Sequence, residues 1–187
     1  MKNLTLIALL LFMAGCSVNS KHRNVALHDL GPVTFAYTQE TAPTSTIKVS
    51  SPTWLSDTRI YYRSLFLTPT VLKSYTLDRW IAEPGELLQR RFSLIKAVQG
   101  RVLQIQLIDF EQQFDAPERA RSSFRFSAEV FRSGSRKPLG QRIFSYSQEN
   151  STPDAAGAIK SFSELSNRAA NDLALWLDTL NASAIKE

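Results

Sequence analysis

The sequence predicts an α+β fold, a two-layer sandwich in which two amphipathic helices cover a mainly antiparallel sheet. Several short segments alternate apolar and polar residues, which is the period of half-buried strands, and two longer segments repeat apolar residues every three or four positions. The connections between the alternating segments are short, which favours antiparallel pairing. The chain has 187 residues, enough for one domain with its own core, which we place at residues 24–187.

The first half of the chain carries the patterns of four short strands. Each contains alternating apolar residues or a cluster of β-branched and aromatic residues, and turn signals such as Gly31-Pro32 separate them. The four predicted strands are residues 24–30, 47–50, 60–62 and 71–80. Residues 34–43 are ambiguous and are assigned no element.

The next segment has the helical period. Pro84 suits the first position of a helix, and Glu83 and Glu86 favour the positive end of the helix dipole. Gly100 is placed to end this helix, which predicts about four turns. Arg91 lies at the border of the apolar face, so we expect its stem to cover apolar surface while its guanidinium group stays in water.

A long strand follows the first helix. Its apolar residues have one parity from Leu103 to Leu107 and the opposite parity from Ile108 to Phe110. One face of a regular strand cannot hold both sets, so we predict either a β-bulge near Leu107 and Ile108 or a long strand that changes its covered face.

The end of the chain predicts a hairpin and then a second helix. Residues 124–130 and 139–147 alternate and flank a turn centred on Gly134. Thr152, followed by a proline and an acidic residue, is the expected N-cap of a helix whose apolar face continues over residues 155–180. This helix completes the two-layer sandwich.

The N-terminus has the pattern of a bacterial lipoprotein signal. Lys2 precedes an apolar run, residues 4–13, that is too short to span a bilayer stably, and two small residues then lead to Cys16. This order resembles the lipobox of bacterial lipoproteins. The resemblance implies a signal peptide of residues 1–15, a diacylglycerol on the Cys16 thiol and a third acyl chain such as palmitate on its amine.

Residues 16–23 comprise the cysteine and a polar segment without a hydrophobic period. We expect them to form a tether between the lipid and the first strand. Ser17, rather than an aspartate, follows Cys16, which resembles an outer-membrane address in enterobacterial sorting. The expected location is therefore the periplasmic face of the outer membrane of a Gram-negative bacterium. The alternative is an ordinary signal peptide with an incidental cysteine.

No catalytic or metal-binding pattern is present in the sequence, so we predict that the protein is not an enzyme and uses no cofactor or metal. His22 and His28 lack clustered acids or thiols, and the nucleophile-elbow, P-loop and dinucleotide motifs are missing. Asp109 and Glu111 lie two apart on one strand face and could form a pair of catalytic carboxylates, but the polar face of a sheet is the favoured interpretation. The net charge of +5 forms no stripe that would track phosphates, which argues against nucleic acid as a partner.

Several segments together carry a resemblance to a known family. The sequence reads V-S-S-P-T-W-L at 49–55, I-Y-Y-R at 60–63, Y-T-L-D-R-W-I-A-E-P at 75–84 and E-L-L at 86–88. In this order and spacing these segments resemble the signature of the ABC-type transport auxiliary lipoproteins, the PqiC/YmbA-like family. The likeness extends over about residues 26–180.

The resemblance implies a periplasm-facing lipoprotein that serves an intermembrane lipid transporter. Such a transporter has an ABC ATPase, a permease and an MCE-type substrate-binding protein, and the MCE protein is the implied partner. The alternative is a stand-alone envelope lipoprotein that binds lipid or another envelope component, with a hydrolase as a distant third. The oligomeric state stays open, a homo-oligomer included.

Four residues are the expected contacts with this partner. Trp54 and Leu55 follow a strand-ending proline and can project from a turn, and Trp80 and Glu83 lie at the neighbouring connection before the first helix. Apolar residues held in a rigid turn make good anchors for a protein partner. The competing interpretation is that the two tryptophans pack in the core, since aromatic residues dominate cores and interfaces alike.

Overall fold

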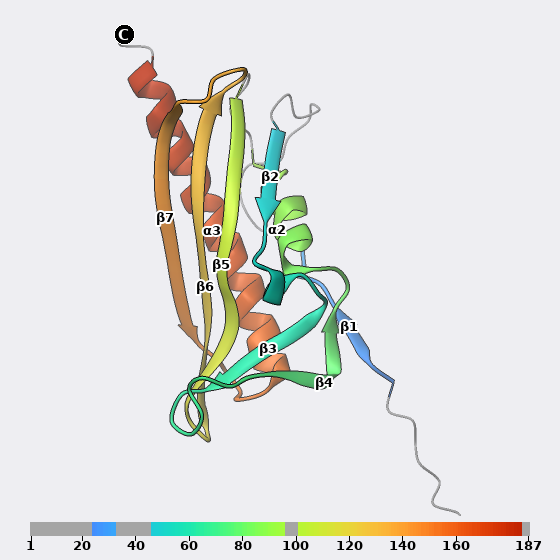
Figure 1. Ribbon diagram of the computed structural model, residues 1–187. Coiled ribbons are helices and arrows are strands. Elements are labelled where there is room, and N and C mark those ends of the chain that lie inside the picture. Colours follow the sequence, from blue (N-terminus) through green and yellow to red (C-terminus); the bar gives the residue numbers. More distant parts are fainter. Residues whose placement is uncertain (1–23, 33–45, 96–100, 185–187) are drawn as a thin grey trace, which may run out of the picture.

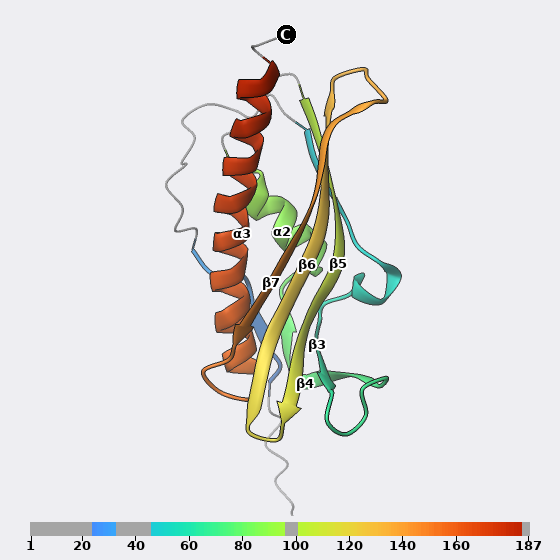
Figure 2. The ribbon, with the colours of Figure 1, turned by 90° about the vertical axis from the view of Figure 1, so that its left-hand side faces the viewer.

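Seven strands form one mixed sheet, and two α-helices cover one of its faces, in the part of the chain that the structure describes (Figure 1, Figure 2). The computed structural model describes residues 24–32, 46–95 and 101–184. The strands are β1 (Ala26–His28), β2 (Thr46–Ser50), β3 (Arg59–Ser64), β4 (Leu72–Trp80), β5 (Arg101–Ala116), β6 (Arg119–Arg132) and β7 (Pro138–Glu149). The helices are α2 (Pro84–Phe92), α3 (Ala155–Ala184) and the short 3-10 helix η1 (Thr53–Leu55).

The sheet order is β1-β4-β3-β5-β6-β7, with β2 beside β5. Antiparallel pairing joins β5 to β6, β6 to β7 and β3 to β4. In contrast, β1 runs parallel to β4, and both β2 and β3 run parallel to β5. The α+β class is confirmed, but the expectation of a mainly antiparallel sheet is wrong, because the sheet is mixed.

The parallel pairs arise because β2 and β3 share one edge of β5 instead of pairing with each other. Thr46 of β2 lies opposite Val102 in the first half of β5, and Tyr62 of β3 lies opposite Gln112 in the second half. The η1 turn carries the chain from one strand to the other without reversing its direction. A period of two residues reports only that a strand is half-buried, and it does not report the direction of the neighbouring strand.

The predicted bulge in β5 is confirmed. The pairing of β5 with β6 shifts register between Leu107 and Asp109, so Ile108 is the extra residue. Leu103 and Leu107 before the shift and Phe110 after it are all buried in the core. The bulge therefore returns the second apolar set of β5 to the face that the helices cover.

The first predicted helix is shorter than expected, since α2 ends at Phe92. The next residue, Ser93, donates hydrogen bonds to the Gln89 carbonyl from both its backbone N–H and its hydroxyl, the latter at 2.7 Å. Ile95 N–H then bonds to the Phe92 carbonyl in a tighter turn. Serine hydroxyls compete with regular helix bonding in this way. The expected end at Gly100 lies outside the described residues.

The last helix begins close to the predicted position but with a different cap. Asp154, not Thr152, is the N-cap of α3, and its carboxylate accepts the Gly157 N–H at 2.9 Å. The Thr152 hydroxyl donates to the same carboxylate at 2.6 Å. These two hydrogen bonds lower the pKa of Asp154, with the Thr152 bond as the larger cause. A side chain at Gly157 would collide with the Thr152 carbonyl, so glycine permits this close start.

The core lies between the sheet and the two helices and is rich in aromatic rings. Phe110 of β5 stacks on Phe162 of α3 with ring centroids 4.0 Å apart, and Phe124 of β6 meets Phe110 edge to face at 5.4 Å. Such pairs add about 0.5–1.5 kcal/mol each to the free energy gained from burial alone. Figure 2 shows α3 running along the whole length of the sheet, with α2 beside it on the same face.

A buried arginine joins the two helices to the segment after β1. Arg91 of α2 is only 4% exposed. Its guanidinium donates to the carbonyls of Leu30 at 2.6 Å and Gly31 at 2.7 Å, and also to the side-chain oxygen of Asn167 on α3. Burial lowers the pKa of Arg91. The expectation that this guanidinium stays in water is wrong, because three acceptors replace its hydration.

We expect Arg91→Met to lower the free energy of unfolding by about 2–4 kcal/mol. Methionine keeps the apolar stem of the side chain but leaves the buried carbonyls of Leu30 and Gly31 with fewer donors. The matched control is Arg90→Met on the exposed side of the same helix, expected to change the value by less than about 0.5 kcal/mol. Urea unfolding of the mature protein measures both, and equal losses in the two variants would contradict the role given to Arg91.

Candidate functional site

The two connections predicted to contact a partner lie side by side in the structure. The Trp80 N–H donates to the Thr58 carbonyl at 2.8 Å, which joins the end of β4 to the segment before β3. Gly85, at the start of α2, lies so close to Ser51 that a side chain there would collide with the serine hydroxyl. We call residues 52–57 and 81–83 the rim. Figure 2 shows η1, which belongs to the rim, projecting on the side of the sheet away from α3.

Trp54 is held in place at the rim by a chain of contacts. It is half-buried, and its ring meets Tyr61 edge to face with centroids 6.0 Å apart. The Tyr61 hydroxyl donates to the Asp57 carboxylate at 2.8 Å, and that carboxylate also accepts the Arg59 N–H. Burial, followed by the hydrogen bond to Asp57, raises the pKa of Tyr61. Trp54 therefore has a fixed position and keeps part of its surface in water.

The four expected contact residues separate into two pairs. Leu55 and Trp80 are core residues, 0% and 1% exposed, and Trp80 packs against Phe110 and Phe162. A partner cannot reach these two side chains in this structure, which removes them from the contact set. Glu83 is exposed at the N-cap of α2 and its side chain makes no capping hydrogen bond.

Trp54 and Glu83 thus remain as the expected contacts. The expected lipidation site, Cys16, and the histidine at position 22 lie outside the described residues.

The acidic pair on β5 is neutralised by arginines of the neighbouring strands. Asp109 pairs with Arg125 of β6 at 2.9 Å, and Glu111 makes a two-pronged contact with Arg63 of β3 at 3.1 Å. Both carboxylates are therefore engaged in holding strands together. In the described part of the chain, no group of three or more His, Cys, Asp or Glu side chains could hold a metal ion.

An open groove of about 540 Å³ lies beside β1 and α3. Its lining includes Leu27, Ile81 and Ile159 together with His28 and Ser163. The His28 ring is 2.9 Å from the Asp78 carboxylate, whereas the Ser163 hydroxyl donates to the Leu30 carbonyl at 2.6 Å. The serine proton thus goes to a main-chain acceptor instead of a base, and the groove is better suited to contact than to acyl transfer.

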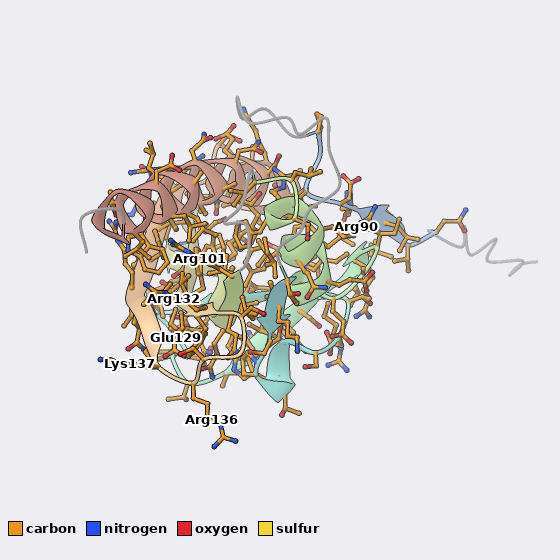
Figure 3. All side chains as sticks on the ribbon, turned by 90° about the horizontal axis from the view of Figure 1, so that it is seen from above. Arg90, Arg101, Glu129, Arg132, Arg136 and Lys137 are labelled. Carbon is orange, nitrogen blue, oxygen red and sulfur yellow. The ribbon has the colours of Figure 1, made fainter. Side chains whose placement is uncertain are left out.

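A basic cluster at the other end of the sheet was missed by the sequence reasoning. Arg101 and Arg132 are directly paired across β5 and β6, and Arg136 and Lys137 lie in the following turn. Figure 3 shows these four side chains at one end of the molecule, with Glu129 among them. Only Arg136 and Lys137 are adjacent in sequence, so the register of β5 against β6 is what gathers the charge.

Comparisons with known proteins identify the fold. No family model matches the chain, and no curated protein matches its sequence. The crystal structure of protein XCC0632 from Xanthomonas campestris, described as a member of family DUF330, matches with a TM-score of 0.70 and 18% identity over 87% of this chain and 100% of that one. The chain therefore has the fold of this DUF330 protein.

Two further solved structures are more distant. A crystal structure described as an uncharacterized protein matches with a TM-score of 0.62 and 10% identity over 81% of this chain and 97% of that one. A structure from Caulobacter crescentus reaches a TM-score of only 0.38 at 15% identity over 55% of this chain and 85% of that one, too low to carry an argument. Separately, none of the helices within the described residues is long and apolar enough to cross a bilayer.

The two tryptophans give a direct test of the division between core and rim. Trp80→Ala is expected to lower the free energy of unfolding by about 3–5 kcal/mol, because it empties a fully buried site. Trp54→Ala is expected to cost about 1–2 kcal/mol, because the ring is half in water and loses mainly its contact with Tyr61. Urea unfolding followed by circular dichroism measures both, and a loss at Trp54 as large as that at Trp80 would place Trp54 in the core.

Proposed function

We propose that the protein is a lipid-anchored, non-catalytic accessory subunit of an MCE/ABC-type intermembrane lipid transport system, located at the periplasmic face of the outer membrane. The motif resemblance over residues 26–180 supports this proposal, and so does the fold shared with the DUF330 protein. The lipobox pattern before Cys16 supports the anchor.

One observation carries the proposal of a docking role. The motif segments 49–55, 60–63 and 75–84 are separated in sequence but meet at the rim in the structure. Trp54 of the first contacts Tyr61 of the second, and the N-terminal end of α2, which follows the third, packs against Ser51 of the first. Trp54 is held half-exposed by these contacts, which is the state that a preformed contact residue for a partner requires.

The rim provides the chemistry of a protein contact. Trp54 supplies a rigid aromatic surface that is already ordered before binding, so little conformational entropy is lost when a partner covers it. Glu83, in the other segment of the rim, is exposed, and its carboxylate makes no capping hydrogen bond. An MCE subunit that reaches across the periplasm from the inner membrane would bury Trp54 and pair a basic or hydrogen-bonding group with Glu83.

A second candidate function is a stand-alone envelope lipoprotein that binds a lipid. The groove beside β1 favours it, because Leu27, Ile81 and Ile159 give it apolar walls. The groove is open, however, whereas pockets for small apolar ligands usually enclose most of the ligand surface. We therefore keep docking of an MCE subunit as the proposed function.

We expect mass spectrometry of the mature N-terminus to show Cys16 carrying three acyl chains. Since several acyl chains anchor stably and one chain only marginally, Cys16→Ala should move the protein from the membrane fraction to the soluble fraction. The matched control, Ser17→Ala, should stay in the outer-membrane fraction, and Ser17→Asp should move to the inner membrane. An unmodified Cys16 peptide, or a mature protein that starts at another residue, would contradict the anchor.

Photo-crosslinking in cells that contain the transporter tests the docking surface. A photoreactive amino acid at Thr53, Ser56 or Glu83, all exposed at the rim, is expected to give crosslinks to an MCE subunit. The matched control sites are Ile143 and Ser145 on the exposed edge strand β7, where no such crosslinks are expected. Crosslinks to the MCE subunit from β7 but not from the rim would show that the partner binds a sheet edge instead.

A further inference from the structure

The loop between β3 and β4 displays apolar side chains to water. We call residues 65–71 the apolar loop. Phe66, Leu67 and Val71 are 48%, 68% and 44% exposed. Single exposed apolar residues are ordinary on protein surfaces, but three within six positions on one protruding turn form a patch. Turns that only connect strands are dominated by polar residues, glycine and proline. The three exposed apolar side chains of this loop therefore point to a role beyond connecting β3 to β4.

The apolar loop is held in a fixed shape. The Thr68 N–H donates to the Ser64 carbonyl at 2.9 Å, and the Val71 N–H donates to the Thr68 carbonyl at 3.0 Å. Arg63 reaches over from β3 and donates to the Pro69 carbonyl at 3.1 Å, while the same guanidinium is fixed by Glu111. These bonds fix the backbone on both sides of Phe66 and Leu67, so the exposure of the two side chains belongs to a defined loop conformation.

The apolar loop lies at the same end of the molecule as the start of β1. Figure 1 shows both in the lower half, opposite the C-terminal end of α3 and the turn between β6 and β7. By register, Ala26 lies opposite Asp78, six residues from Leu72, where the apolar loop ends and β4 begins. Six strand residues span at most about 20 Å.

The chain between the start of β1 and the acylated cysteine is long enough to place both on one membrane. The segment from Cys16 to Asn24 has eight peptide steps, which reach at most about 27 Å. Val25 and Leu27, next to the point where this segment joins the domain, are also exposed. Acyl chains on Cys16 and the apolar loop can therefore enter the same leaflet.

We propose that the apolar loop inserts Phe66 and Leu67 into the bilayer leaflet that holds the acyl chains of Cys16. This inference rests on the lipid anchor of the proposed function. The anchor keeps the domain at the lipid surface, so insertion of the apolar loop is a local step at a high effective concentration and needs little affinity of its own.

Insertion fixes the orientation of the domain. With two points of attachment, the acylated N-terminus and the apolar loop, the domain can no longer rotate freely about its tether. The end with Arg101, Arg132 and the β6–β7 turn then points away from the membrane (Figure 1, Figure 3). Exposed charges at this end include the cations Lys73 on β4 and Arg119 at the start of β6, with the carboxylate of Glu118 next to Arg119, and lipid headgroups would meet all three.

A fluorescent reporter on the apolar loop tests the proposal. Cys16 is the only cysteine of the chain and is blocked when acylated, so Thr70→Cys gives the mature protein one free thiol within the apolar loop. An environment-sensitive dye on this thiol is measured in vesicles of phosphatidylethanolamine and phosphatidylglycerol that contain spin-labelled lipid. We expect a shift of its emission to shorter wavelength and loss of intensity through quenching by the shallow spin label.

Matched variants separate insertion from mere proximity. The same dye on Ser133→Cys, in the turn at the opposite end, should show neither change. Adding Phe66→Ser and Leu67→Ser to Thr70→Cys should abolish both changes, whereas adding Ile143→Ser, which removes an equally exposed apolar side chain from β7, should leave them.

Each outcome either supports or overturns the proposal. An unquenched Thr70 dye on a protein that remains in the vesicle fraction overturns insertion and leaves the anchor intact. A shift without quenching means that protein, not lipid, covers the apolar loop, which also overturns it. A mass that lacks the acyl chains in the same sample overturns the anchor and, with it, the insertion that rests on it.

Discussion

The buried guanidinium of Arg91 is the interaction on which the arrangement of this protein depends. Its three acceptors come from two places, the Leu30 and Gly31 carbonyls after β1 and the Asn167 side chain on α3, while its own backbone belongs to α2. β1 itself is short and, among the described strands, lies at the edge of the sheet and pairs with β4 alone. A charge that has lost its hydration cannot leave these acceptors without cost, so Arg91 holds the segment after β1 and, with it, the short strand that the chain from Cys16 enters.

The two ends of the molecule differ in the side chains that they expose. The apolar loop and the start of β1 lie at one end, and the basic cluster of Arg101, Arg132 and the β6–β7 turn lies at the other (Figure 1, Figure 3). The long strands β5 to β7 and the helix α3 span the distance between them and keep the two ends apart. If the proposed anchor and the apolar loop hold one end at a membrane, this rigid body presents the opposite end away from it.

The sequence predicts those features that depend on neighbours along the chain. The bulge at Ile108 follows from a change of parity within one strand, and the start of α3 follows from a cap within three residues. The parallel pairing of β2 and β3 with β5 could not be predicted, because alternation does not reveal which strand lies alongside. The burial of Arg91 could not be predicted for the same reason. Its acceptors lie about 60 and 76 residues away in the sequence, and no local pattern indicates that they would meet it.

The candidate site shows why the rim was only partly predictable. Trp54 and Trp80 both lie at short connections between elements, Trp54 in η1 after β2 and Trp80 at the end of β4, and both belong to segments that resemble the transporter-accessory family. The structure separates them: Trp80 is buried in the core against Phe162 of α3, while Trp54 is half-exposed and meets Tyr61 at the rim. Because Trp80 also donates its N–H to Thr58 in the connection that follows η1, the buried tryptophan helps to position the exposed one. Under the proposed docking function, one motif would serve both packing and docking, with the core tryptophan providing the rigidity that a half-exposed aromatic anchor requires.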